Sequence, residues 1–156
     1  MRINILMVCL GNICRSPMAE GLMIEKGKKY NLNIHVDSAG FEAFHTGDAP
    51  DERAINTMKK HGYNISHLRS RTIKKEDFIK FDKIYIMDKY NLEKIKHISS
   101  HPDDLQKVDF IYNAIEPESN KAVDDPYYGN ISDFENTYQI LDKATEIIAQ
   151  KLSHSN

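Results

Sequence analysis

The chain opens with a run of apolar residues over 3–8 that is interrupted by a single asparagine. An apolar run without alternation is typical of a parallel strand that is buried on both faces. Apolar residues at helical spacing follow, and they predict a helix over residues 17–30. Ser16 suits the N-cap of this helix, and Pro17 suits its first position. The N-terminal part therefore predicts a buried strand, a short loop and a helix.

The rest of the chain alternates between predicted strands and predicted helices. The last helix has the clearest start, because Ser132-x-x-Glu135 matches a capping box ahead of an apolar stripe. The other expected elements are strands over 33–37, 83–87 and 108–112, and helices from Pro50 to Gly62, over 74–79 and from Asp88 to about residue 97. This order predicts right-handed β-α-β crossovers. We therefore expect one α/β domain over residues 1–156, in three layers, with a central, mostly parallel sheet of four strands.

Composition and charge narrow the class of protein. A chain of 156 residues with 40% apolar and 28% charged residues is ordinary for one globular domain. The formal net charge of −2 gives no reason to expect nucleic acid or a membrane surface as a partner. The first apolar run is shorter than a signal peptide requires, and no window approaches the ~18 apolar residues of a membrane span. The two cysteines, Cys9 and Cys14, form no disulfide framework, so we expect a reducing, cytoplasmic setting.

The loop after the first strand carries the most reactive side chains. Five residues separate Cys9 from Arg15. Gly11 and Asn12 allow the intervening chain to curl, so that its N–H groups converge on one anion, and the arginine donates two parallel bonds to phosphate oxygens. The helix N-terminus, the arginine and the hydroxyl of Ser16 stabilise a thiolate on the cysteine. We predict that this loop binds a phosphate ester and that the thiolate attacks its phosphorus. A buried structural cysteine beside a chance arginine is the competing interpretation.

Displacement of a phenolate from phosphorus requires an acid that protonates the leaving oxygen. The segment Asp124-Asp125-Pro126 is the best source of this acid in the sequence. Asp125 precedes a proline, so its backbone is extended and its side chain projects from a stiff turn. Because adjacent carboxylates in such a segment face different ways, we expect one acid and not a coupled pair. A solvated Asp-Pro turn without a chemical role is the alternative.

Two motifs stand near the ends of the chain. The first runs from Cys9 through Arg15-Ser16 to Pro17, and the second is Asp125-Pro-Tyr-Tyr. Shorter characteristic segments between them are 36–40, 47–51, 76–78, 81–82, 87–88 and 91–92. With these motifs the sequence resembles the low-molecular-weight protein tyrosine phosphatases, over essentially its whole length.

The resemblance implies hydrolysis of protein phosphotyrosine and of small aryl phosphates. It implies a phosphocysteine intermediate on Cys9, a phosphate clamp at Arg15, and Asp125 as the general acid that then acts as a base. It implies no cofactor and no metal. The expected partners are phosphotyrosine-containing proteins, with inorganic phosphate or other oxyanions as product or inhibitor.

The resemblance also assigns residues around these three. Asn12 is expected to hold the loop in a strained form through side-chain bonds to Ser38 and its neighbours. Phe44 is expected to form one wall of the substrate cleft, and Tyr127 and Tyr128 the facing wall. Such aromatic walls select phosphotyrosine over the shorter phosphoserine. The phosphate-binding loop is expected to consist of Leu10, Gly11, Asn12, Ile13, Cys14 and Ser16.

One expected support is ambiguous. The family usually has a histidine shortly after the second helix that supports the phosphate loop. Counting forward from that helix places it at His67, whereas counting back from Arg71 places Leu68 there. The sequence carries one extra residue, and we expect His67 to support the site together with Ser38 and Asp88.

Three alternatives stand beside phosphotyrosine hydrolysis. Arsenate reductases share this loop but need resolving cysteines downstream, and the sequence has none after Cys14. Relatives that act on phosphoarginine have threonine at the position of Ile13, where isoleucine favours phosphotyrosine. The third alternative is a non-catalytic thiol redox or phosphate-binding module that uses Cys9 and Cys14. In an enzyme, the same pair predicts redox regulation, with Cys14 capturing oxidised Cys9 as a reversible disulfide.

Overall fold

The computed structural model describes residues 1–155 and is built on a parallel sheet with the strand order β2-β1-β3-β4. The strands are β1 (Ile3–Val8), β2 (Ile34–Ala39), β3 (Lys83–Ile86) and β4 (Val108–Phe110). The last residue of β1, Val8, is level with Ala39 of β2 and Ile86 of β3. The carboxyl ends of three strands therefore meet at one edge, which is where sheets of this kind bind ligands.

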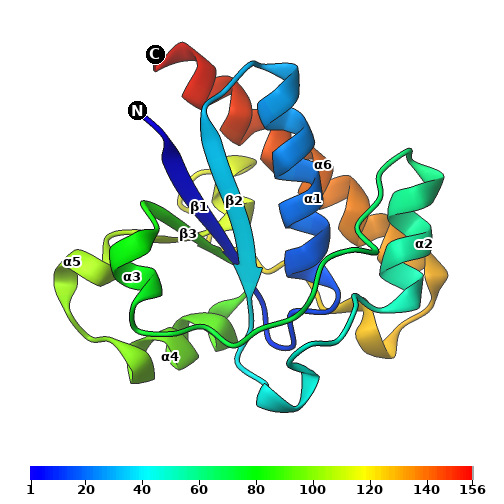
Figure 1. The fold of residues 1–156 in the computed structure, drawn as a ribbon, viewed down its shortest axis with the longest axis horizontal. Helices are drawn as coiled ribbons and strands as arrows, with labels where there is room; N and C mark the ends of the chain where they lie inside the picture. The colour runs from blue at the N-terminus through cyan, green and yellow to red at the C-terminus, as the bar shows by residue number, and fades with distance from the viewer. Residues whose placement is uncertain (156) are drawn as a thin grey trace.

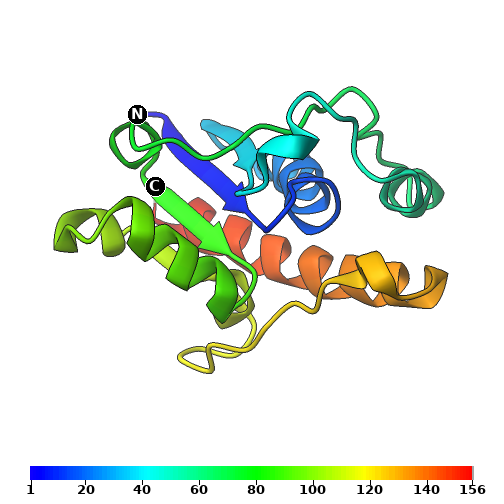
Figure 2. The same cartoon turned by 90° about the horizontal axis from the view of Figure 1, so that it is seen from below.

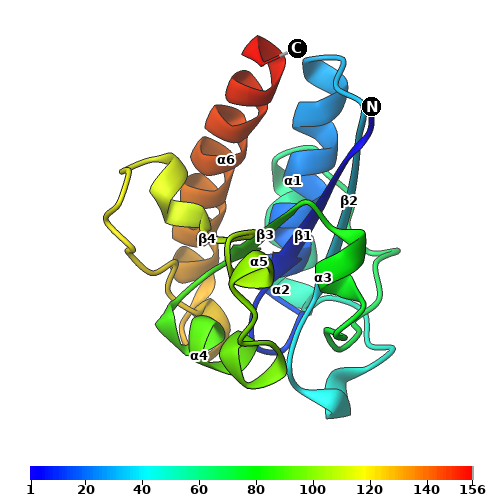
Figure 3. The ribbon, with the colours of Figure 1, turned by 90° about the vertical axis from the view of Figure 1, so that its left-hand side faces the viewer.

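Helices cover both faces of the sheet, as Figures 1 and 3 show. Alternate side chains of β1 separate the two faces, because Met7 belongs to one buried cluster while Leu6 and Val8 belong to the other. The helices are α1 (Arg15–Lys29), α2 (Glu52–Lys60) and α6 (Ile131–His154) on the first face, and α3 (Asp77–Lys80), α4 (Lys89–Ile98) and α5 (Pro102–Leu105) on the second. The predicted three-layer α/β arrangement with a four-stranded sheet is confirmed. Within residues 1–155, no helix is long and apolar enough to cross a membrane.

The longest helix, α6, starts differently from the prediction. Its N-cap is Asn130, whose side chain accepts from the N–H of Asp133, while the Asp133 side chain accepts from the N–H of Asn130. The hydroxyl of Ser132 donates to Asn130 Oδ1 at 2.5 Å. Ser132 therefore supports the cap from inside the helix and does not form it, and the predicted capping box with Glu135 is wrong.

Two other helix starts follow from short polar side chains. Asp51 caps α2 by accepting from the N–H of Arg53, so that helix begins two residues after Pro50. Asp88 caps α4 as predicted, and Asn91 completes a capping box there. This second cap matters for the site, because it fixes Asp88 at the carboxyl end of β3.

The remaining differences concern element ends. β2 extends to Ala39, β4 ends at Phe110, and α3 covers only the end of its predicted range. The structure also contains α5 and three short 3₁₀ helices that were not predicted, η1 (Ala43–His45), η2 (Ile111–Ala114) and η3 (Pro126–Tyr128). Two of these, η1 and η3, lie where no helix or strand is predicted, and both contribute residues to the cleft beside the first loop.

Candidate active site

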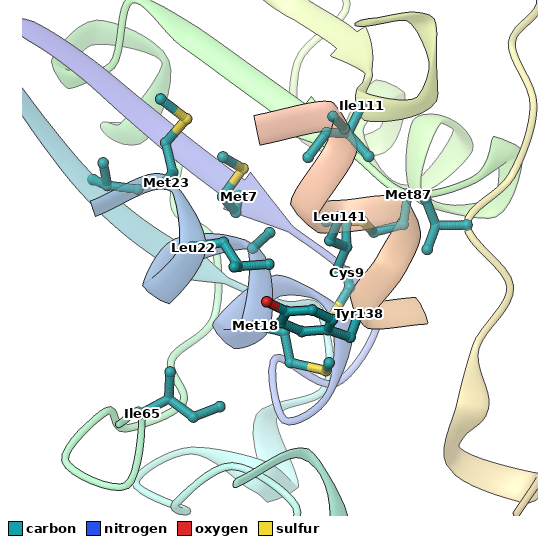
Figure 4. Close-up of a cluster of buried hydrophobic side chains, with 14 of the residues drawn as sticks. Met7, Cys9, Met18, Leu22, Met23, Ile65, Met87, Ile111, Tyr138 and Leu141 are labelled. Carbon is teal, nitrogen blue, oxygen red and sulfur yellow. The ribbon is translucent and has the colours of Figure 1, made fainter. Parts of the chain in front are cut away.

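The loop that follows β1 lies at the carboxyl edge of the sheet and leads directly into α1 (Figure 2). Its first residue, Cys9, is buried, with 3% of its surface exposed. Figure 4 shows Cys9 among side chains of both adjacent helices, Met18 of α1 and Tyr138 and Leu141 of α6. One strand and two helices therefore fix the position of the thiol.

Ser16 supplies two donors to this thiol. Its N–H group lies 3.4 Å from Cys9 Sγ, and its hydroxyl oxygen lies 3.0 Å from the same sulfur. The hydroxyl accepts a hydrogen bond from Asn12 Nδ2 at 2.8 Å, so its own hydrogen is free to point at the sulfur. Because α1 begins at Arg15, the positive end of the helix dipole lies at the same place. These contacts stabilise a thiolate.

The predicted capping role of Ser16 is wrong. The N-cap of α1 is Cys14, and no side chain makes a capping hydrogen bond there. Pro17 consequently occupies the third helical position, where its missing N–H is still not needed. The hydroxyl of Ser16 is directed to the sulfur instead, so a tertiary contact outweighs the local capping preference.

Asn12 holds the turn of the loop from inside. Its φ of 56° lies in the left-handed region. Its amide group donates to Ser38 Oγ at 2.9 Å and accepts from the N–H of Arg71 at 3.0 Å. A Cβ on Gly40 would lie 2.8 Å from the backbone nitrogen of Asn12, so only glycine allows this close approach. The loop is therefore braced by two segments that are distant in the sequence.

The expected support from His67 is not present. His67 is exposed and lines a separate surface pocket with Tyr63 and Asn64. The hydrogen bond to the side-chain oxygen Oδ1 of Asn12 is donated by the backbone N–H of Arg71, not by a histidine. His67 is thus on the surface, and a main-chain N–H group supplies the donor to Asn12.

Arg15 is almost completely buried, with 2% of its surface exposed. Its Nη1 donates to Asp88 Oδ2 at 2.7 Å and to the carbonyl of Val123 at 2.8 Å, and its Nη2 lies 3.7 Å from Asp125 Oδ2. Burial by itself lowers the pKa of the Arg15 guanidinium. The electrostatic interaction with Cys9, the hydrogen bond to Asp88 and the charge of Asp125 outweigh this effect, so the pKa of Arg15 is raised. Its Nε is buried and has no partner within the described residues. The arginine is therefore fixed, charged and left with free donors.

The backbone of the loop adds further donors. Over the part of the chain that the structure describes, the N–H groups of residues 11–14 donate to no protein acceptor. They surround a left-handed residue at the N-terminus of a helix, which is the geometry of an anion-binding nest. With the free Nε of Arg15 they make a site for an oxyanion with several charges.

A cleft of about 130 Å³ opens above Cys9. Phe44 of η1 and Tyr127 and Tyr128 of η3 line it and are exposed. The two tyrosine rings meet edge to face, with their centroids 4.9 Å apart. The complete lining is Cys9, Leu10, Gly11, Ile13, Cys14, Arg15, Glu42, Phe44, His45, Asp125, Tyr127 and Tyr128. Segments from both ends of the chain thus meet at one aromatic-walled cleft.

Asp125 brings a carboxylate to this cleft. It caps η3 by accepting from the N–H of Tyr127 at 3.1 Å, which leaves its other oxygen towards Arg15. Asp124 is exposed and does not line the cleft. Of the two adjacent carboxylates, only Asp125 is placed to exchange a proton with a group bound over Cys9.

Glu20 is a site residue that the sequence analysis missed. It lies in α1 with 6% of its surface exposed and accepts from Ser38 Oγ at 2.5 Å, so the chain of bonds runs from Glu20 through Ser38 and Asn12 to Ser16. Burial raises the pKa of Glu20 from about 4.5 to about 7. A glutamate one helical turn beyond Ser16 gives no sequence signal of this role, because the bridging Ser38 comes from β2.

Replacement of Glu20 by glutamine tests this burial. A carboxyl group with a raised folded-state pKa makes the folded state bind more protons, so the stability of the wild type falls as pH rises from about 4.5 to about 7. We expect Glu20→Gln to remove this fall, so that the variant gains up to about 3 kcal/mol relative to the wild type between pH 5 and pH 8. Urea unfolding at pH 5 and at pH 8 measures this difference in the free energy of unfolding, and Glu93→Gln on the exposed face of α4 is the control. A difference that stays constant with pH would contradict the raised pKa.

Main-chain groups account for the other contacts that the sequence analysis missed. The carbonyl of Val123 and the N–H of Arg71 act through atoms that every residue carries, so no pattern of side chains identifies them. Gly40 did carry a signal, because it ends the segment 36–40 that the sequence analysis recognised as characteristic.

A buried thiol beneath a set of free N–H donors, with a carboxyl group lining the same cleft, is the arrangement expected of a cysteine-dependent phosphatase. The comparisons with known proteins agree with this class. The family model described as low molecular weight phosphotyrosine protein phosphatase matches residues 4–156. The human low molecular weight phosphotyrosine protein phosphatase is 41% identical over 138 residues, which cover 87% of each chain.

Solved structures show the same fold. A protein tyrosine phosphatase from Entamoeba histolytica superposes with a TM-score of 0.90 at 33% identity and covers 98% of each chain. A structure of the arginine phosphatase YwlE, 26% identical, superposes with a TM-score of 0.86 and covers 96% of this chain and 95% of its own. The chain belongs to the low molecular weight phosphotyrosine protein phosphatase family, and it is a phosphatase.

Proposed function

We propose that the protein hydrolyses phosphotyrosine through a covalent phosphocysteine intermediate, with Cys9 as nucleophile, Arg15 as phosphate clamp and Asp125 as general acid and base. The observation that carries this proposal is the convergence of the three side chains on one cleft. Cys9 lies in the loop after β1 and Arg15 at the start of α1, whereas Asp125 comes from a segment more than 100 residues later.

In the first step, the Cys9 thiolate attacks phosphorus while the bond to the tyrosine oxygen breaks. The free donors of Arg15 and the N–H groups of residues 11–14 hold the non-bridging oxygens, and they act most strongly as charge develops there. Asp125, protonated in this step, gives its proton to the leaving phenolate. The products are tyrosine, an Asp125 carboxylate and a phosphorylated Cys9.

In the second step, water replaces tyrosine in the cleft. Asp125, now ionised, takes a proton from the water as the water attacks phosphorus and the bond to sulfur breaks. The sulfur leaves as a thiolate, and the two donors of Ser16 lower the cost of that charge. Inorganic phosphate is released and binds the same donors, so phosphate and other oxyanions are competitive inhibitors.

The lining of the cleft supports phosphotyrosine as the substrate. Phe44, Tyr127 and Tyr128 line the same cleft as Cys9, so a flat ring that packs against them has its phosphate within reach of the thiol. Ile13 also lines the cleft and presents an aliphatic surface to that ring. Phosphoserine is too short to bring its phosphate to the thiol from between these walls.

A panel of three phosphopeptides of the same flanking sequence tests the substrate class. We expect phosphotyrosine to be hydrolysed at least about 100-fold faster, in kcat/KM, than phosphoserine or phosphoarginine, because only its ring fills the cleft. Phosphate release is measured for each, and Ile13→Thr serves as a matched variant for the phosphoarginine alternative. Faster hydrolysis of phosphoarginine by the wild type would assign the protein to that alternative.

Cys14 supports a second role for the loop. Both cysteines are free thiols, and burial, followed by the charges of Asp51 and Cys9, raises the pKa of Cys14. Oxidation of the Cys9 thiolate by peroxide gives a neutral sulfenic acid, which removes one of those charges. Attack by Cys14 then forms a disulfide and releases water, and a dithiol restores both thiols. The free thiols also support the reducing cytoplasm as the compartment.

We therefore expect Cys14→Ser to lose the protection of Cys9. After a brief exposure to peroxide, dithiothreitol should restore most of the activity of the wild type. It should restore less than half of the activity of Cys14→Ser, because Cys9 of the variant oxidises further to forms that dithiothreitol does not reduce. Activity is measured before peroxide, after peroxide and after reduction. Equal recovery of the two proteins would exclude this role for Cys14.

A further inference from the structure

We propose that Glu42 selects phosphotyrosine substrates that carry a lysine or arginine next to the phosphotyrosine. The inference rests on the proposed function, because it requires the phosphorylated ring to occupy the cleft over Cys9.

The main chain of Glu42 is anchored beside the phosphate-binding loop. Its N–H group donates to the carbonyl of Leu10 at 3.3 Å, and its own carbonyl accepts from the N–H of His45 at 3.3 Å. Its side chain lines the cleft and is partly exposed. A Cβ on Gly11 would lie 3.3 Å from Glu42 Oε1, so the carboxylate stands directly against the loop that binds the anion.

The other acidic groups around the cleft each have a side-chain partner. Asp125 faces Arg15, Asp48 pairs with His45 at 3.2 Å, and Asp51 pairs with Arg53 at 3.0 Å. Among the residues that the structure describes, the Glu42 carboxylate takes part in no ion pair and no hydrogen bond. The nearby arginines are already committed to other carboxylates. Glu42 is thus an unpaired negative charge at the edge of a site that receives a phosphate.

Such a charge opposes binding of the phosphate unless the substrate brings a cation of its own. A peptide whose phosphotyrosine ring lies between Phe44 and Tyr128 crosses the rim of the cleft, because both aromatic side chains are exposed there. A basic side chain adjacent to the phosphotyrosine then reaches Glu42 and pairs with it, while an acidic one is repelled. The Glu42 carboxylate therefore favours phosphotyrosine peptides with a basic flanking residue over peptides with an acidic one.

The test compares phosphotyrosine peptides that differ only in the residues flanking the phosphotyrosine, which are lysine, glutamine or glutamate. We expect the wild type to hydrolyse the lysine peptide about 10-fold faster than the glutamate peptide, in kcat/KM, at low salt, and the ratio to shrink at 0.5 M NaCl (about three times physiological ionic strength). Glu42→Gln should lower this ratio to about 2, and Glu42→Lys should invert it. Glu93→Gln, on the exposed face of α4, should keep the wild-type ratio.

Each outcome is informative because the ratio between peptides is measured within one protein. A wild type that hydrolyses all the peptides equally fast would overturn the proposal, as would a lysine preference that survives in Glu42→Gln. Both results would leave the phosphotyrosine activity intact. A wild type that hydrolyses none of the phosphotyrosine peptides would instead overturn the proposed function, and this inference with it.

Discussion

Cys9→Ser is expected to abolish hydrolysis of p-nitrophenyl phosphate, with a loss on the order of 10⁴-fold or more in kcat. A serine hydroxyl is not ionised at neutral pH, and the two donors of Ser16, which stabilise a thiolate, cannot make it a comparable nucleophile. The substitution also removes a negative charge from beneath the phosphate. Phosphate is therefore expected to bind at least as tightly as it binds the wild type.

Two measurements separate loss of the nucleophile from loss of the site. Steady-state release of p-nitrophenol reports turnover, and calorimetric titration with inorganic phosphate reports the anion site formed by Arg15 and residues 11–14. We expect the first to vanish and the second to persist in Cys9→Ser. Retained turnover would remove Cys9 from the mechanism, and loss of both would mean that the loop itself had collapsed.

Asp125→Asn is expected to lower the rate of phenol release from phenyl phosphate by about 10²–10⁴-fold, the usual contribution of a general acid. Asparagine keeps the shape of the side chain and its bond from the N–H of Tyr127, but it has no proton to give. A substrate with a good leaving group, such as 2,4-dinitrophenyl phosphate, needs no proton, so its first step should slow far less. Because the second step also needs the carboxylate, this substrate should show a burst followed by slow turnover.

The neighbouring carboxylate supplies the control. Asp124 is exposed and outside the cleft, so Asp124→Asn should change either rate by less than about threefold. If Asp124→Asn is the damaging substitution, the wrong carboxylate has been assigned. If Asp125→Asn slows both substrates equally in the first step, the residue has a structural role and does not transfer a proton.

The first strand, the loop and the first helix could be predicted because their signals are local. An unbroken apolar run, a glycine-bearing turn and a proline in the first helical turn lie within 17 residues, and the thiol and the arginine lie inside that stretch. The sheet topology followed from the alternation of strands and helices, which restricts parallel strands to few arrangements. These parts depend on neighbours in the sequence and on rules that hold for most folds.

The errors fall where a tertiary contact competes with a local preference. Serine is a residue type that favours the N-cap position, but the hydroxyl of Ser16 contacts the Cys9 sulfur instead. His67 lies on the surface in a separate pocket, and a backbone N–H of Arg71 donates to the Asn12 side chain instead. Such contacts depend on segments that come together only in the folded chain.

The phosphate-binding loop keeps its shape only while distant segments of the folded chain hold it, so activity should be lost when the fold is lost. Asn12 is held by Ser38 and by the backbone of Arg71, and Gly40 packs against its backbone nitrogen. No peptide limited to the first loop and helix contains these groups, so a fragment ending before Arg71 has no means to keep the turn. Inactivation during urea titration should accordingly coincide with loss of the helices, as a single cooperative event.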